Sequence, residues 1–176
     1  MEQQNIYLTG FMGSGKSTIG QLLAKELAYQ WIDLDDLIIA RNKMSIAKVF
    51  SKYGERFFRK EEATVLRNTQ NIEKAIISTG GGTPCFENNM TWINQHGLSI
   101  FIDPAIPVLL GRLLQGQDKR PLLRDKNPFE LEVFIRQKLA ERRPVYEQAH
   151  LHYTQEEEDI QPVQPLLVQI KSYYAQ

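Results

Sequence analysis

The stretch LTGFMGSGKSTIG, residues 8–20, decides the fold. Within it, GFMGSGKS (10–17) matches the pattern G-x-x-x-x-G-K-[ST] in full. Glycines allow a tight turn that points successive backbone N–H groups inward, and the N-terminus of the following helix adds partial positive charge. The stretch therefore predicts a phosphate-binding loop between a strand and a helix.

This loop supplies the predicted contacts to a nucleoside triphosphate. Lys16 is placed to reach the β- and γ-phosphates, and the Ser17 hydroxyl is placed to ligate Mg²⁺. The other loop residues predicted to contact ATP are Gly13, Ser14, Gly15 and Thr18. A hydrolytic switch, a motor and a small-molecule kinase all use such a loop. The chain lacks the guanine-reading N-K-x-D motif of a switch, and 176 residues leave little room for a mechanical domain, which favours a small kinase.

Short apolar segments alternate with helical segments along the rest of the chain. The five candidate strands are residues 5–9, 31–33, 74–79, 98–103 and 150–154. This alternation predicts an α/β fold with a parallel sheet covered by helices on both faces. The first helix, 17–29, is expected to bury Ile19, Leu22, Leu23 and Leu27, and Gly54 is expected to separate two later helices. The polar, basic segment 115–127 is predicted to be a lid rather than a plain surface loop.

Composition restricts the class of protein. A chain that is 42% hydrophobic and 24% charged fits one globular domain over residues 1–176. The net charge of zero gives no broad attraction to nucleic acid or to anionic membranes. The N-terminal segment resembles neither a signal peptide nor a membrane span, and the single cysteine, Cys85, fits a reducing compartment. We therefore expect a cytoplasmic protein.

Two carboxylates, Asp33 and Asp35, lie at the end of the second predicted strand, in WIDLDD. Ligands of doubly wound sheets gather at the carboxyl ends of the strands. One carboxylate is thus predicted to hold a metal-bound water while the other faces the acceptor. The alternative is a helix-capping aspartate with solvated neighbours.

Two further stretches suit a small anionic substrate. In GERFFRKEE, Arg59 and Glu62 are spaced i,i+3 and can pair, which leaves guanidinium donors for a substrate carboxylate. STGGG (78–82) ends a buried strand in three glycines, which allow a ligand to approach backbone N–H groups closely.

Six motifs follow one another at compatible spacings: GFMGSGKST (10–18), DLD (33–35), FRKEE (58–62), STGGG (78–82), KRPLL (119–123) and ERRPVY (141–146). In these motifs the chain resembles the shikimate kinases, small P-loop enzymes of the nucleoside-monophosphate-kinase-like group. The resemblance implies a three-layer P-loop fold with a five-stranded parallel sheet, helices on both faces and a mobile lid at about 113–126. It also implies a substrate-binding helical region at about 34–62.

The resemblance implies which residues of this chain bind shikimate, a carboxylate with three hydroxyls. They are Asp35, Arg59, Gly81, Gly82 and Arg142. Asp35 is assigned to the hydroxyls, Arg59 and Arg142 to the carboxylate, and Gly81 to a backbone N–H beside it. In ERRPVY, Arg143 is the less favoured choice for the second arginine.

On the nucleotide side, the resemblance assigns Asp33 to the magnesium shell with Ser17. Arg120, in KRPLL, is assigned as the lid arginine that folds over the ATP phosphates, and Arg112 as the residue that packs on adenine. Because phosphoryl transfer depends mostly on positioning and charge neutralisation, the expected catalytic residues are Lys16, Asp35 and Arg120.

The implied activity is ATP- and Mg²⁺-dependent phosphorylation of the 3-hydroxyl of shikimate, which gives shikimate 3-phosphate and ADP in the biosynthesis of chorismate and aromatic amino acids. The alternatives are a gluconate kinase-like or other small-molecule P-loop kinase, and a non-catalytic nucleotide-binding module. The expected partners are small-molecule substrates, with neither nucleic acid nor membrane, and we expect a monomer.

Overall fold

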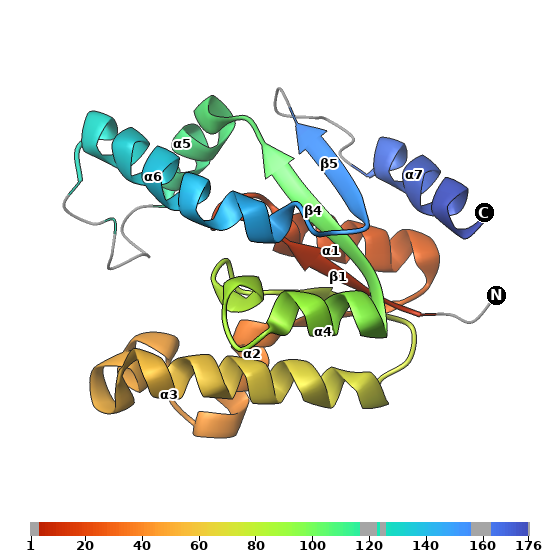
Figure 1. Cartoon of the computed structure of the whole chain (residues 1–176), viewed down its shortest axis with the longest axis horizontal. Helices are drawn as coiled ribbons and strands as arrows, with labels where there is room; N and C mark the ends of the chain where they lie inside the picture. The colour runs from red at the N-terminus through yellow and green to blue at the C-terminus, as the bar shows by residue number, and fades with distance from the viewer. Residues whose placement is uncertain (1–3, 117–122, 124–125, 156–162, 176) are drawn as a thin grey trace.

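A parallel sheet lies at the centre of the molecule (Figure 1). The computed structural model describes residues 4–116, 123, 126–155 and 163–175. Within these residues the sheet has five strands in the order β2-β3-β1-β4-β5, all parallel. The strands are β1 (Asn5–Thr9), β2 (Gln30–Asp33), β3 (Ala75–Ser78), β4 (Gly97–Pro104) and β5 (Leu151–Gln155). The predicted parallel α/β architecture is confirmed.

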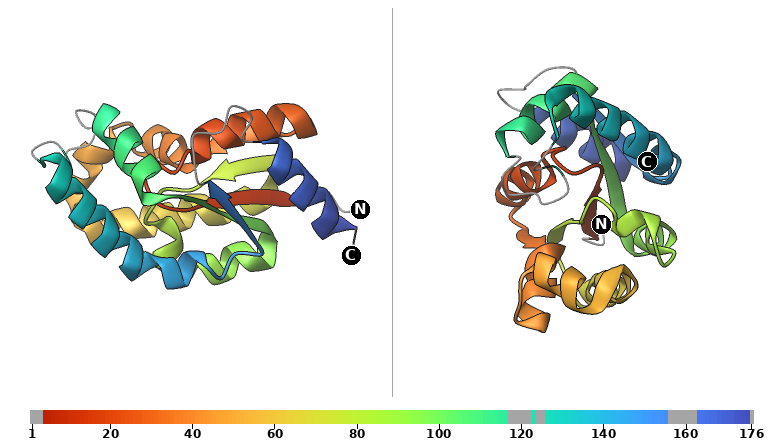
Figure 2. Two further views of the ribbon diagram at one scale, coloured as in Figure 1. Left: turned by 90° about the horizontal axis from the view of Figure 1, so that it is seen from above. Right: turned by 90° about the vertical axis from the view of Figure 1, so that its left-hand side faces the viewer.

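Helices cover both faces of this sheet. They are α1 (Lys16–Leu27), α2 (Leu34–Asn42), α3 (Ile46–Asn68), α4 (Asn89–His96), α5 (Ile106–Gln115), α6 (Pro128–Tyr146) and α7 (Gln164–Tyr174), with the short 3-10 turns η1 (Thr69–Asn71) and η2 (Thr83–Cys85). In the left view of Figure 2, α1 and α4 lie on opposite sides of the strands. None of the described helices is long and apolar enough to cross a membrane.

The alternating side chains of β1 divide the core. Ile6 and Leu8 face α1 and α7, whereas Tyr7 faces α2, α3 and α4. A third apolar cluster joins α5 and α6 around Phe11 and Phe101. Figure 1 and the right view of Figure 2 show the α2–α3 pair and the α5–α6 pair at opposite sides of the molecule. The loop that follows β1 therefore opens between two separate helical pairs.

Two details of the helices bear on the predictions. Gly54 interrupts α3 with φ 78° and ψ 172°, so the predicted break between two helices is confirmed. The expectation for Leu22 is wrong, because its side chain is 40% exposed. Ile19 and Leu23, one helical turn apart, take the sheet-facing stripe of α1, and Leu22 lies beside that stripe.

Candidate functional site

The glycine-rich loop connects the end of β1 to the start of α1, as predicted. Gly10, Gly13 and Gly15 all have positive φ, of 134°, 78° and 93°. Gly15 lies in the left-handed region as the N-cap residue of α1, a conformation that a side chain disfavours. The backbone is thereby turned so that the loop ends directly at a helix N-terminus, where anions are stabilised.

Lys16 begins α1 and folds back over the loop. Its side chain is buried, and its Nζ donates to the carbonyl oxygens of Gly10 at 2.9 Å and Phe11 at 2.8 Å. A third bond of 3.3 Å reaches Ser14 Oγ. These bonds hold the ammonium group at the loop itself, so that its charge lies beside the backbone that would surround a phosphate.

Ser17 and Asp33 meet at the carboxyl edge of the sheet. The Ser17 hydroxyl donates to Asp33 Oδ2 at 2.9 Å, while Asp33 Oδ1 accepts the backbone N–H of Asp35 at 3.0 Å and caps α2. Asp33 thus performs the capping role that the sequence left open and also faces the phosphate loop. One hydroxyl and one carboxylate fit a magnesium ion, which takes few protein oxygens and completes its shell with water and phosphate oxygens. The described residues contain no group of three or more acidic, histidine or cysteine side chains that would form an all-protein site.

Asp35 lies between the phosphate loop and the segment after β3. Burial, followed by the negative charges of Asp33 and Glu62, raises the pKa of Asp35 to about 6, although Lys16 opposes the rise. A methyl group built on Gly80 would lie 3.4 Å from Asp35 Oδ1 and 2.9 Å from Glu62 Oε1. The two carboxylates therefore flank Gly80, and Asp35 is a partly desolvated acceptor suited to a hydroxyl.

Arg59, on α3, is held by two acidic side chains. Its Nη1 donates to Glu62 Oε2 at 2.6 Å, which confirms the predicted i,i+3 pair. Its Nε and Nη2 both donate to Glu55 Oε1, at 3.2 and 2.9 Å. The guanidinium also lies 4.1 Å from the ring centroid of Phe86, a cation–π distance. The position of this guanidinium is thus set from three sides.

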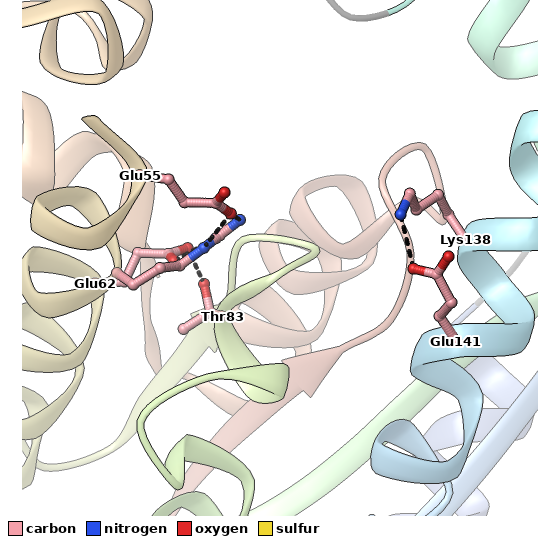
Figure 3. Close-up of polar contacts among 6 residues, drawn as sticks. Glu55, Glu62, Thr83, Lys138 and Glu141 are labelled. Atoms are coloured by element: carbon pink, nitrogen blue, oxygen red, sulfur yellow. Dashed lines mark hydrogen bonds and ion pairs between the residues drawn. The ribbon is translucent and has the colours of Figure 1, made fainter.

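Glu62 is itself held in place by a second hydrogen bond. Its side chain is only 2% exposed, and its second oxygen accepts the Thr83 hydroxyl at 2.5 Å (Figure 3). Burial raises the pKa of Glu62, while the bonds from Thr83 and Arg59 oppose that rise. The Thr83 carbonyl in turn accepts Asn89 Nδ2 at 2.8 Å, and Arg67 donates to Asn89 Oδ1 at 2.7 Å. A buried chain of hydrogen bonds therefore fixes Arg59 and the glycine segment relative to each other.

The glycine segment also lies against the phosphate loop. A methyl group on Gly81 would come within 2.9 Å of the backbone nitrogen of Met12, and one on Gly82 within 2.7 Å of Arg59 Nη1. The buried Tyr146, from the end of α6, donates its hydroxyl to the Gly81 carbonyl. The absence of side chains at Gly81 and Gly82 therefore lets the two loops and Arg59 pack together.

The two adjacent arginines of ERRPVY lie in different surroundings. Arg143 makes bonds of 2.7 and 2.8 Å to the two oxygens of Asp103. The guanidinium of Arg142 lies 5.8 Å from the ring centroid of Phe11, a residue of the phosphate loop. The positive charge of Arg142 also opposes the rise in the pKa of Glu62. This geometry favours Arg142 as the substrate arginine, while its role stays a prediction.

The remaining predicted residues lie on the nucleotide side. Arg112, on α5, donates from Nη1 to the Ser14 carbonyl at 3.2 Å and to Gln155 Oε1 at 3.5 Å, so it lies against the phosphate loop. Thr18 is exposed in the first turn of α1. Arg120 and most of the predicted lid lie outside the described residues, and their roles stay predictions.

Several side chains of the site were not anticipated. Glu55 is spaced i,i+4 from Arg59, a signal that the sequence contained. Thr83 and Phe86 reach the site only through the folding of distant segments, and no local pattern marks them. Tyr146 ends the ERRPVY motif, but its contact with Gly81 could not be read from that motif. Figure 3 also shows Lys138 and Glu141 on α6, across from Glu55, joined by a 2.7 Å ion pair.

Comparisons with known proteins identify the family of this chain. The shikimate kinase family model matches residues 12–171. A shikimate kinase from Bacteroides fragilis is 43% identical over 148 residues, which cover 84% of this chain and 83% of the relative. The crystal structure of shikimate kinase from Bacteroides thetaiotaomicron has a TM-score of 0.90 at 36% identity, covering 98% of this chain and 99% of that one. A shikimate kinase from Acinetobacter baumannii in complex with shikimate has a TM-score of 0.85 at 32% identity, covering 98% and 96%. The chain therefore belongs to the shikimate kinase family.

Proposed function

We propose that this protein transfers the γ-phosphoryl group of ATP to the 3-hydroxyl of shikimate and releases shikimate 3-phosphate and ADP. The observation that carries the proposal is the position of Arg59 and Asp35 beside the phosphate loop. The glycine segment that contacts Arg59 also approaches Met12 of that loop. A carboxylate-binding group and a hydroxyl-binding group thus lie next to the phosphate donor site.

Recognition of the acceptor rests on charge and hydrogen bonding. Arg59 and Arg142 bind the substrate carboxylate, with a backbone N–H of Gly81 beside it and Gly82 in the same segment. Asp35 accepts from the ring hydroxyls. An analogue that lacks the hydroxyl opposite Asp35 would leave a buried carboxylate unpaired, so discrimination against it is large.

The donor is bound by the phosphate loop. Its backbone N–H groups, Lys16 and the start of α1 contact the phosphates, and Arg112 lies on the side of the nucleotide. Ser17 and Asp33 would hold Mg²⁺, which supplies positive charge to the β- and γ-phosphates when it is bound. The proposed lid, about 113–126, brings Arg120 over these phosphates.

The reaction forms a bond between the 3-hydroxyl oxygen of shikimate and the γ-phosphorus and breaks the bond from that phosphorus to the β,γ-bridging oxygen. Asp35 orients the attacking hydroxyl and takes its proton. With a pKa of about 6, Asp35 is ionised at neutral pH and still basic enough for this task. Lys16 neutralises charge on the transferred group.

The proposed organisation of the chain is that of a single domain. Residues 1–176 form one domain, in which about 34–62 is the substrate-binding helical region. The protein acts as a cytoplasmic monomer on small-molecule substrates. Family membership does not favour the alternatives, a gluconate kinase-like enzyme or a non-catalytic nucleotide-binding module.

A coupled assay of ADP release tests the activity. The full chain is incubated with ATP and Mg²⁺ and with shikimate, gluconate or a nucleoside monophosphate as acceptor. We expect turnover with shikimate and little with the others. Turnover with gluconate alone would establish the first alternative, and ATP binding without stimulation by any acceptor would establish the second.

A further inference from the structure

The two acidic partners of Arg59 differ in how firmly they are held. Glu62 is 2% exposed, and each of its oxygens has a hydrogen-bond donor, Arg59 on one and Thr83 on the other. The Glu55 side chain is 60% exposed, and its ion pair with Arg59 has a length of 2.9 Å. Water therefore surrounds the Glu55 side of this pair, whereas the Arg59 side chain is only 13% exposed. Glu55 is therefore the partner that can be displaced from Arg59.

The bonds of Glu55 also occupy a particular edge of the guanidinium. Its Oε1 accepts from both Nε and Nη2 of Arg59. This edge presents two parallel N–H groups, the arrangement to which a carboxylate binds with both oxygens. Glu62 takes the other side, at Nη1. Glu55 and a substrate carboxylate cannot both bind the Nε–Nη2 edge in this way.

The surroundings allow Glu55 to leave without disturbing Arg59. Glu55 directly follows Gly54, where α3 is broken and a methyl group would meet nothing within 4 Å. The exposed carboxylate enters water when it leaves and is not desolvated. Arg59 keeps its bond to the buried Glu62 and its contact with the Phe86 ring at 4.1 Å.

We propose that Glu55 is an internal competitor for the substrate carboxylate, which occupies the Nε–Nη2 edge of Arg59 until the substrate displaces it. This inference rests on the proposed function, because it concerns the same carboxylate. While Glu55 is in place, Arg59 and its two acidic partners carry a net negative charge, which repels anions that bind weakly. Glu55 thus lowers the affinity of the site for every carboxylate by the same factor, so that anions of low intrinsic affinity leave it empty.

The competing interpretation is that Glu55 merely orients Arg59 for the substrate. The two interpretations predict opposite changes in the affinity for shikimate when Glu55 is removed. If Glu55 competes, its removal strengthens the binding of shikimate. If Glu55 orients Arg59, its removal weakens that binding.

The chain offers a matched control on α6. Glu132 Oε1 accepts from Nε and Nη2 of Arg136 at 3.0 and 2.6 Å, with the same i,i+4 spacing and the same donor atoms. Both side chains of this pair are exposed, and neither belongs to the proposed site. Glu132→Gln therefore removes the same charge and the same kind of bond elsewhere in the molecule.

The experiment measures shikimate binding to the full chain by calorimetry, together with kcat and the KM values for shikimate and ATP. The variants are Glu55→Gln, Glu55→Ala and Glu132→Gln. We expect both Glu55 variants to bind shikimate about 2- to 5-fold more tightly, the change that loss of an ion pair with one solvated partner gives. We expect the KM for ATP to be unaltered, and Glu132→Gln to match the original protein.

Equal or weaker binding of shikimate by both Glu55 variants, in a protein that turns over shikimate, would overturn this inference and leave the proposed function intact. If the original protein neither binds nor phosphorylates shikimate, both fall. A gain of the same size in Glu132→Gln would also overturn the inference, because the effect would then be one of net charge.

Discussion

The hydroxyl of Ser17 and the carboxylate of Asp33 are joined by a 2.9 Å hydrogen bond across 16 residues of sequence. This bond ties the first turn of α1 to the last residue of β2. The second oxygen of Asp33 simultaneously caps α2. One carboxylate therefore connects the phosphate loop to the helix that carries Asp35.

From this relationship we predict that Asp33→Asn and Ser17→Ala raise the Mg²⁺ concentration required for half-maximal activity by about tenfold or more, because each removes a ligand oxygen or its partner. Turnover is titrated with Mg²⁺ at a fixed ATP concentration. Asp36→Asn is the control, since Asp36 is exposed on the same helix. An unchanged Mg²⁺ requirement in both variants would remove Ser17 and Asp33 from the metal site.

A second prediction concerns the acidic limb of the pH profile. The pKa of Asp35 is raised to about 6, and the protonated carboxyl cannot accept the substrate hydroxyl proton. Affinity for shikimate and kcat/KM should therefore fall as the pH drops through about 6. Calorimetric titrations of shikimate between pH 5 and 8, without nucleotide, provide the check. Constant affinity over this range would exclude an ionised Asp35 from binding.

The raised pKa of Asp35 also carries a cost in stability. A carboxyl whose pKa is higher in the folded than in the unfolded protein destabilises the fold above its unfolded value of 3.8, and the full effect is present above about 6. Asp35→Asn should thus abolish turnover yet raise the free energy of unfolding at pH 8 by about 1–3 kcal/mol. Urea denaturation at pH 8 and pH 4 measures this. The gain should shrink to about 0.5 kcal/mol at pH 4, close to the unfolded pKa, and a loss of stability at pH 8 would contradict the argument.

The neighbouring arginines Arg142 and Arg143 should respond differently to replacement. Arg142→Ala should raise the KM for shikimate by about 10- to 100-fold, since it removes a charged hydrogen-bond donor. Arg143→Ala should leave that KM nearly unaltered and lower the free energy of unfolding by about 1 kcal/mol or more, because Asp103 loses its paired charge. Steady-state kinetics and thermal unfolding of both variants decide between them. The opposite pattern would assign the substrate carboxylate to Arg143.

A methyl group added to Gly81 should damage the site without unfolding the chain. It would lie 2.9 Å from the backbone nitrogen of Met12, so the phosphate loop and the glycine segment would have to separate. We expect kcat/KM of Gly81→Ala to fall at least tenfold. Gly111→Ala is the matched control: nothing lies within 4 Å of the new methyl group in α5, and the helix should gain about 0.5–1 kcal/mol. Equal activity in the two variants would show that the close approach at Gly81 is unimportant.

The parts of this molecule that sequence alone predicts are those set by local spacing. The five strands, the break at Gly54 and the Arg59–Glu62 pair depend on residues close together in the chain. The choice between Arg142 and Arg143 depends instead on Asp103, 40 residues away from Arg143. Adjacent residues on a helix point in different directions, and only the packing of α6 against β4 determines which one meets that carboxylate.

Long-range contacts account for the other features that the sequence did not reveal. The Glu62–Thr83 bond joins segments 21 residues apart, and the Tyr146–Gly81 bond spans 65 residues. Such pairs follow no periodic pattern. They arise because the interior of α3, the C-terminal end of α6 and the turn after β3 meet at the carboxyl edge of the sheet.

The central place of β1 in the sheet has a consequence for synthesis on the ribosome. Although Asn5–Thr9 emerge first, their partners in β3 and β4 are made only when Ala75–Ser78 and Gly97–Pro104 follow. The phosphate loop is completed equally late, because Gly10 packs against the carbonyl of Ile102. A nascent chain that already contains the whole glycine-rich motif therefore cannot be stabilised by ATP binding until more than half of the protein has been translated.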